Sequence, residues 1–116
     1  MTETCDPRIG VRFGTIDEAG PGETLLIEGG AVADRPGATH FVLTPRNATH
    51  SLGCACCAPR GPVAEALGRL FLARARGEVP WFRSVVAATH SIAGREAVRT
   101  ALTEDVVTSA RFRADP

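Results

Sequence analysis

Three of the four cysteines of this chain lie within four consecutive positions, at Cys54, Cys56 and Cys57. Thiolates at i, i+2 and i+3 on a loop can converge on one metal ion, and soft sulfur ligands select Zn²⁺ or Cu(I) over Mg²⁺. The stretch GCACCAPRG, residues 53–61, is therefore a candidate metal site, with Zn²⁺ as the expected ion.

A tetrahedral zinc site needs a fourth ligand beside the three thiolates. We name His50 and His90 as the first candidates, because His50 lies four residues before Cys54 and His90 follows an expected buried strand, where α/β sheets place their ligands. The remaining candidates are His40, Cys5 and a water molecule. Each histidine also has an ordinary alternative as a surface or hydrogen-bonded side chain, and Cys5, near the terminus, is expected to take no part.

The three thiols have other interpretations. They can be small residues of a tight loop between sheet and helix, reactive only by accident. A redox role is a second alternative, because low-pKa thiols arise near helix N-termini such as the one expected at Pro62. A disulfide between Cys56 and Cys57 is strained and disfavoured.

Composition restricts the class of partner. The chain of 116 residues has the length of one domain, and its net charge is zero, which gives no electrostatic reason to expect nucleic acid or an anionic membrane. No apolar run approaches the roughly 20 residues that span a bilayer, and the stretch MTETCDPRIG has neither the basic region nor the apolar run that signal peptides have. We expect a soluble cytoplasmic protein whose cysteines are reduced or bind metal.

All thirteen basic residues are arginines, and lysine is absent from the sequence. A Schiff-base lysine and a P-loop lysine are therefore both excluded.

The first half of the chain, residues 1–52, is expected to be rich in strands and loops. Short apolar runs predict strands at 8–16, 24–30 and 39–44, and the Gly- and Pro-containing stretch 17–23 predicts a turn.

The second half, residues 53–116, changes character after the cysteines. Apolar residues at helical spacing predict an amphipathic helix over 62–76, ended by Gly77. The run SVVAA at 84–88 predicts a strand buried on both faces. Residues 94–113 predict one or two short helices, with Thr103 as an N-cap. Trp81 and Phe82 are expected in the core, and the arginines of the first helix are expected to face solvent.

The segment from about 52 to 113 resembles the GTP-binding domain of the CobW family, whose relatives include the HypB and UreG metallochaperone GTPases. A Gly-Cys-x-Cys-Cys motif, a link with Arg and Gly, a Leu-bearing helix and a buried strand follow in the family's order here, as GCACCAPRGPVAEALGRLFLARARGEVPWFRSVVAATH and then AVRTALTEDVVTSARFR. The resemblance implies that the three cysteines form a metal-binding element. It also implies a small α/β protein with a partial P-loop-type three-layer fold and a largely parallel sheet.

Three elements of GTP chemistry depart from the family's pattern. The nearest counterpart of the P-loop is DEAGPGET at 17–24, with Asp17 in place of the first glycine and Glu23 in place of the lysine. The buried strand ends in Ala-Ala-Thr-His at 87–90, where the family has Glu-Thr-Thr-Gly. The lysine of the guanine-reading motif is missing. We therefore expect no GTPase activity.

The expected function is transition-metal binding in metal trafficking, with zinc as the ion. The alternative is a metal-free interaction module that uses an open sheet edge, either as a homodimer or as a partner of a full-length CobW-like GTPase. A third possibility is a weak GTP-binding protein with an unrecognised phosphate loop.

Overall fold

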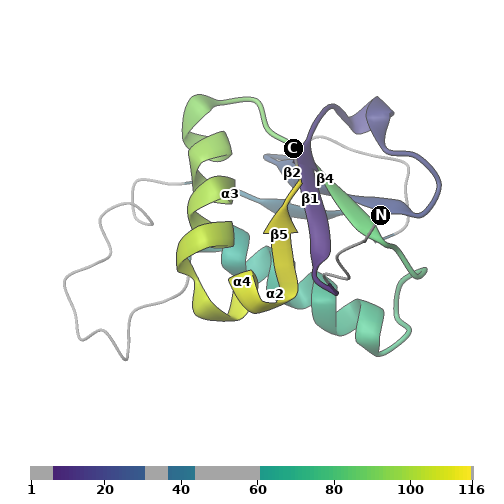
Figure 1. Ribbon diagram of the computed structural model, residues 1–116. Helices are drawn as coiled ribbons and strands as arrows, with labels where there is room; N and C mark the ends of the chain where they lie inside the picture. The colour runs from purple at the N-terminus through teal and green to yellow at the C-terminus, as the bar shows by residue number, and fades with distance from the viewer. Residues whose placement is uncertain (1–6, 31–36, 44–60, 116) are drawn as a thin grey trace, which may run out of the picture.

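The computed structural model describes residues 7–30, 37–43 and 61–115 (Figure 1). They form the strands β1 (Ile9–Phe13), β2 (Glu23–Glu28), β3 (Thr39–Phe41), β4 (Ser84–Ala88) and β5 (Phe112–Ala114), the helices α2 (Pro62–Ala75), α3 (Ile92–Glu104) and α4 (Val106–Arg111), and the 3₁₀ turn η1 (Ile16–Glu18). The described residues before α2 contribute strands and one 3₁₀ turn, which confirms that the N-terminal half is β-rich.

All strand pairs in the described residues are parallel, and the five strands lie in the order β3-β2-β4-β1-β5. This confirms the predicted α/β fold with a parallel sheet. The run SVVAA forms β4 at the centre of the sheet, between β1 and β2, and Val85, Val86 and Ala87 are fully buried, as a strand covered on both faces requires.

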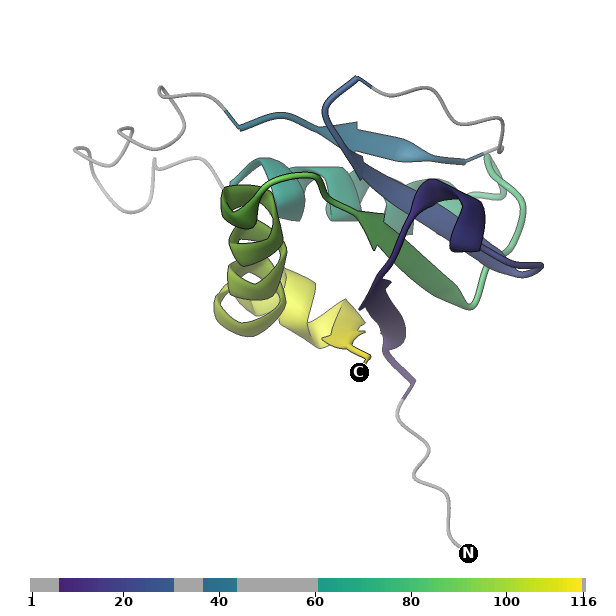
Figure 2. The same ribbon diagram turned by 90° about the horizontal axis from the view of Figure 1, so that it is seen from above.

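The two faces of the sheet are covered differently, as Figure 2 shows. On one face Val11, Leu26 and Val85 pack against the three helices in the main core. On the other face Leu25 and Val86 pack with Ala19, beside η1. The connections β3–β4 and β4–β5 cross the helical face, and β1–β2 crosses the other face in the opposite direction along the sheet, so the crossovers share one hand.

Helix α2 follows its sequence pattern closely. Its N-cap is Gly61, Pro62 occupies the first turn, and Val63, Leu67 and Leu70 are buried against the sheet. After α2, Gly77 has a φ of +73°, the left-handed conformation predicted for it. None of the helices in the described part of the chain combines the length and the apolar character needed to cross a membrane.

Residues 91–114 depart from the prediction in three places. Helix α3 begins two residues earlier than expected, because the Ser91 side chain caps it by accepting a hydrogen bond from the Gly94 amide. The prediction of Thr103 as an N-cap is wrong: Asp105 caps α4, since its carboxylate accepts from the amides of Val107 and Thr108. The chain then leaves the helix at Phe112 and forms β5 beside β1.

The aromatic pair before β4 divides between core and surface. Phe82 is 2% exposed, as predicted, but Trp81 is 66% exposed, so its prediction as a core residue is wrong. The Trp81 ring lies under the guanidinium of Arg74, whose carbon is 3.6 Å from the ring centroid. Arg74 also donates to the Phe82 carbonyl at 2.9 Å. This arginine of α2 therefore packs on the aromatic pair, whereas the sequence predicted that it faces solvent.

Candidate functional site at the carboxyl edge of the sheet

The carboxyl ends of β1, β2 and β4 lie side by side at one edge of the sheet. Strands β1 and β4 are neighbours whose connections leave toward opposite faces, through η1 and α3 respectively. Such a switch point is where open α/β sheets bind their ligands. A hollow of about 360 Å³ lies there, lined by Gly14, Thr15, Ile16, Asp17, Ile27, Glu28, Ala88, Thr89 and His90.

Glu28, the last residue of β2, anchors this edge. Its side chain reaches the start of α3, where Oε1 accepts hydrogen bonds from the backbone amides of His90 at 2.8 Å and Ser91 at 3.1 Å. The Ser91 hydroxyl donates to Oε2, and the Gly94 amide donates to the Ser91 hydroxyl oxygen at 2.9 Å. A buried carboxylate thus satisfies amides at a helix N-terminus, where negative charge is also favoured by the helix dipole.

The environment of Glu28 favours its ionised form. Burial by itself raises the pKa of this carboxyl, but the hydrogen bonds from Ser91 and from the amides of His90 and Ser91, together with the nearby imidazole, outweigh it and lower the pKa below its ordinary value. Glu28 therefore carries a negative charge at neutral pH although it is only 7% exposed.

Gly94 allows the Glu28 carboxylate to lie against α3. A β-carbon added at Gly94 would come within 2.0 Å of Glu28 Oε1 and 2.7 Å of Oε2. No side chain fits there without moving the carboxylate. The glycine inside the first turn of α3 is therefore required by a close approach, although glycine ordinarily weakens a helix.

His90 is the candidate site residue that the structure places at this edge. Its imidazole is exposed, and Nε2 lies 3.6 Å from Glu28 Oε2. That distance is too long for a hydrogen bond but short enough for an electrostatic contact. The imidazole therefore has one ring nitrogen near a carboxylate, and within the described residues its other ring nitrogen forms no hydrogen bond.

The predicted cysteine ligands Cys54, Cys56 and Cys57, together with His50 and Cys5, lie outside the described residues. The chain between 43 and 61 joins the carboxyl end of β3 to the N-terminus of α2. His40 is exposed on β3. Within the described residues, 7–30, 37–43 and 61–115, no group of three or more His, Cys, Asp or Glu side chains is placed to hold a metal ion.

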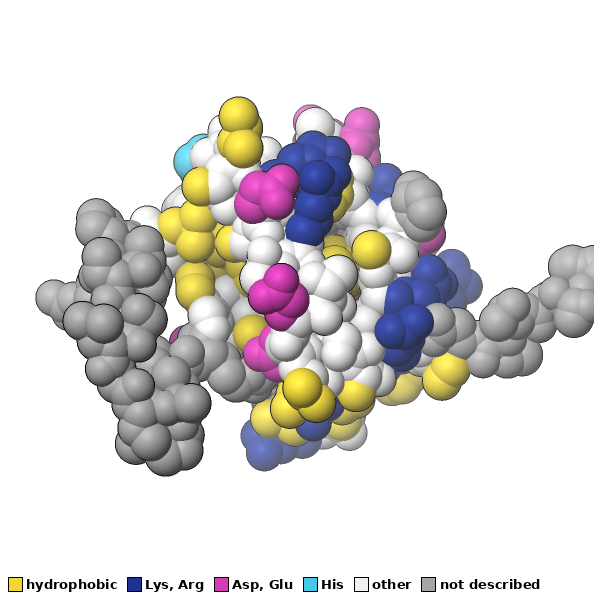
Figure 3. All heavy atoms as spheres, turned by 60° about the vertical axis from the view of Figure 1, so that its left-hand side comes forward, with side chains coloured by type: hydrophobic (Ala, Val, Ile, Leu, Met, Phe, Trp, Pro, Cys, Tyr) yellow, Lys and Arg dark blue, Asp and Glu magenta, His cyan; other side chains and the backbone are white. Residues whose placement is uncertain are grey.

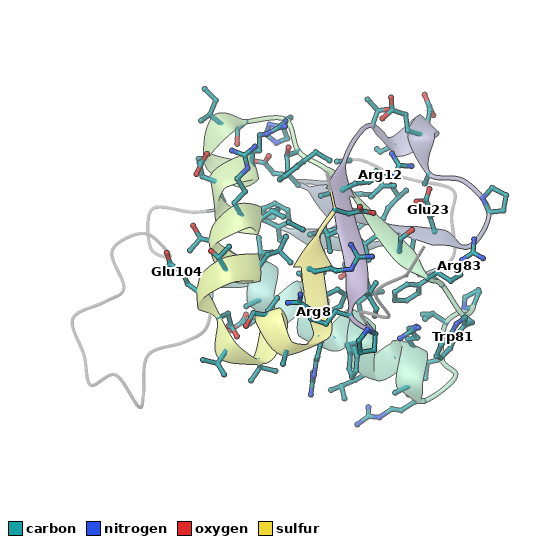
Figure 4. The ribbon with its side chains drawn as sticks, viewed as in Figure 1. Arg8, Arg12, Glu23, Trp81, Arg83 and Glu104 are labelled. Carbon is teal, nitrogen blue, oxygen red and sulfur yellow. The ribbon has the colours of Figure 1, made fainter. Side chains whose placement is uncertain are left out.

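A second polar cluster lies on the opposite face, and the sequence did not predict it. Arg12 of β1 donates to both carboxylate oxygens of Glu23, at 2.8 and 3.3 Å, and Figure 4 shows the two side chains turned toward one another. Glu23 also accepts from the Ser84 hydroxyl and the Gly20 amide, at 2.8 and 2.9 Å. These hydrogen bonds, that from Arg12 above all, lower the pKa of Glu23 to about 2.

The position of Glu23 also bears on the stretch DEAGPGET. A P-loop cradles phosphate between a strand and the helix that follows it. Here residues 16–18 form η1, the chain turns at 21–22, and Glu23 is already the first residue of β2. The described residues of this stretch therefore lead into a strand, and Glu23 is bound to an arginine.

Comparison of the chain with known protein families, with curated proteins and with solved structures found no match in any of the three.

Glu28 and Ser91 are the site residues that sequence reasoning missed. Ser91 carried a usable signal, because a serine directly before an apolar, helix-forming stretch is a typical N-cap. Glu28 carried a weaker one, a single acid at the end of the apolar run TLLIE. Its partners lie 62 and 63 residues further along the chain, so the pairing follows from the fold and not from local sequence.

Proposed function

We propose that this protein binds a transition metal, zinc foremost, through the thiolates of Cys54, Cys56 and Cys57, and that it acts in metal trafficking as a relative of the CobW family. The observation that carries the proposal is the Cys-x-Cys-Cys spacing. Three soft donors within four positions supply most of a tetrahedral zinc shell from one short segment.

His90 is the fourth ligand in this proposal. Its support is the position of the imidazole, which is exposed at the carboxyl edge of the sheet with Nε2 3.6 Å from the Glu28 carboxylate. Glu28 is itself held by the backbone amides of His90 and Ser91 and by the Ser91 hydroxyl, so the carboxylate is fixed in place. The order of the chain is compatible with this assignment. Strands β3 and β4 are parallel, so both end at the same edge of the sheet, and the cysteine segment follows β3 in the sequence.

The protein carries no GTPase activity of its own in this proposal. Two observations support the lack of GTPase activity. The sequence contains no lysine, and Glu23, which stands in place of the P-loop lysine, forms an ion pair with Arg12. A carboxylate at that position repels phosphate. We expect millimolar GTP with Mg²⁺ to leave the thermal unfolding midpoint unchanged, because a ligand that binds the folded state raises it.

The experiment that tests metal binding is elemental analysis of tag-free protein, purified under reducing conditions without chelator. We expect about one zinc per chain in the wild type, and little in the Cys54, Cys56, Cys57→Ser variant. Cys5→Ser is the matched control and should keep its metal. Equal zinc in the wild type and the triple variant, with both folded by circular dichroism, would remove the cysteines from the site.

A second candidate is pairing between copies of the chain through the edge of the sheet at β3. In the described residues β3 pairs with β2 on one side only, and Val42, directly after it, is 55% exposed. Light scattering at several protein concentrations separates the candidates. A metal-free dimer favours edge pairing, and a zinc-bound monomer favours the metal site.

A further inference from the structure

Two arginines of α3 converge on one aromatic ring of β1. The guanidinium carbons of Arg95 and Arg99 lie 4.3 and 5.5 Å from the centroid of the Phe13 ring. The two residues are one helical turn apart, and like charges at this spacing repel and destabilise a helix. Cation–π attraction offsets part of that repulsion, and the result is two positive charges held at one place on the surface.

The two charges are unequally compensated. Arg99 lies 3.4 Å from the carboxylate of Glu96 in the preceding turn. Arg12, on the neighbouring part of β1, is engaged with Glu23. The Arg95 side chain forms no ion pair within the described residues, where it contacts the Phe13 ring. Of these three arginines, Arg95 is therefore the one that has no carboxylate partner in the part of the chain that the structure describes.

A hollow of about 450 Å³ opens beside these arginines. It is lined by Val11, Arg12, Phe13, Arg95, Arg99, Leu102, Ala114 and Asp115. Four of these residues are apolar, so the hollow joins an apolar floor to a basic rim. Figure 3 shows basic side chains gathered beside acidic ones on the α3 face of the molecule. Next to apolar surface an ionic contact is less screened than in open water.

Asp115 makes one side of the hollow acidic, whereas Arg95 and Arg99 make the other side basic. Its amide donates to the Val11 carbonyl at 2.8 Å, and its carboxylate lies beside Gly10 and 3.7 Å from an Arg113 nitrogen. The Asp115 carboxylate thus lies beside Gly10, three residues before Phe13 on β1, whereas Arg95 and Arg99 lie at the Phe13 ring. An anionic group is attracted to the α3 side and repelled at the β5 side, so a ligand with a single acidic head fits best.

We propose that this hollow binds a small organic anion with one acidic head and an apolar body. The head, a phosphate monoester or a carboxylate, contacts the guanidinium groups of Arg95 and Arg99. The body covers Phe13, Val11 and Leu102. Arginine suits both head groups because its planar donors match their oxygens in pairs.

The test uses phenyl phosphate and benzoate as probes, with inorganic phosphate and benzyl alcohol as the head alone and the body alone. Affinity is measured by calorimetry, and amide chemical shifts locate the site. We expect phenyl phosphate or benzoate to bind at least about tenfold more tightly than either fragment, with shifts at residues 11–13 and 95–102. The pair of complete probes shows which head is preferred.

The double variant Arg95→Gln, Arg99→Gln should weaken the preferred probe at least about tenfold. Arg69→Gln, on the exposed side of α2, is the control and should leave it unchanged. Both sets of arginines are exposed, and the zinc content should be unaffected, so this test stands apart from the metal proposal. Absence of binding at millimolar probe, or equal binding by the double variant and the control, would overturn the proposal and leave the arginines as a cover for Phe13.

Discussion

Glu23 and Glu28 occupy the two ends of one strand, β2, and are stabilised as anions by opposite means. Glu23 faces the side away from the helices and is bound by the positive charge of Arg12. Glu28 faces the helical side and is bound chiefly by backbone amides and a hydroxyl at the start of α3. The first carboxylate joins strands to each other, and the second joins the sheet to the start of a helix and lies beside the His90 imidazole.

The two carboxylates differ in how much of their surroundings remains open to a ligand. Both oxygens of Glu23 are used by partners from β1, β4 and the turn at Gly20, so this cluster is a structural tie between strands. Glu28 fixes the edge where β1 and β4 send their connections to opposite faces, and the exposed imidazole of His90 lies next to it. The carboxyl edge is therefore the better candidate for ligand binding.

The largest expected effect comes from adding one methyl group at the Glu28 end. Gly94→Ala should lower the free energy of unfolding by about 3 kcal/mol, because the new β-carbon occupies the place of the Glu28 carboxylate and breaks its hydrogen bonds. Urea unfolding measures it. The control Ile92→Ala, at a position 82% exposed in the same turn, should change stability by less than about 0.5 kcal/mol.

A double variant sharpens the same prediction. In a Glu28→Ala background the carboxylate is gone, so Gly94→Ala should be neutral, or stabilising by up to about 1 kcal/mol as the helix propensity of alanine dictates. If Gly94→Ala cost the same with and without Glu28, the close approach would not be the reason for the glycine.

The second largest effect is expected at the Glu23 end of β2, where the carboxylate is paired with an arginine. Glu23→Gln should lower the free energy of unfolding by about 2 kcal/mol at pH 7, since it weakens the charge-assisted hydrogen bonds that the largely buried Glu23 carboxylate accepts. The folded pKa of about 2 lies below the ordinary 4.5, so the wild type should lose this stability as the pH falls from about 4.5 to about 2. Unfolding measured across that range should show a flatter acid limb in the variant. An unchanged limb would contradict the assignment.

The smallest expected effect is that of Ser91→Ala, and its salt dependence distinguishes the hydrogen bonds from neutral donors around Glu28 from the ion pair of Glu23. Ser91→Ala removes the hydroxyl that binds both Glu28 and the Gly94 amide, and it should cost about 1 kcal/mol, as N-cap losses do. Salt should change the stability difference between wild type and Glu23→Gln more than that between wild type and Ser91→Ala, because only the first involves an ion pair of partly exposed groups. Equal salt dependence would erase the distinction.

The parts of the fold that follow local sequence patterns were predictable. The helical spacing of apolar residues predicted α2, and the unbroken apolar run predicted β4, since both patterns reflect which faces are buried. Strand β5 was not predicted, because its three residues directly follow α4 and pair with β1, about a hundred positions earlier. The prediction that Trp81 lies in the core was wrong because Arg74 of α2 covers one side of its ring at the surface. Hydrophobicity alone does not predict such a cation–π contact.

The candidate site also contains one residue that local sequence predicted and one that it did not. His90 was predicted at the end of β4 because a buried strand in a parallel sheet ends where ligands bind, and the structure places it there. The role of Glu28 depends on two strand ends and a helix meeting in space, which no local pattern in the sequence indicates. The cysteine ligands remain a prediction from their spacing alone.

The most direct test of the proposed metal site is the absorption spectrum of the Co²⁺-substituted protein, since Co²⁺ replaces Zn²⁺ and reports its ligands. The wild type should show thiolate-to-cobalt charge transfer and the intense d–d bands of a tetrahedral site. His90→Ala should keep the charge-transfer bands and change the d–d bands, whereas His40→Ala should match the wild type. A spectrum without thiolate charge transfer, or one that His90→Ala leaves unchanged, would contradict the site as proposed.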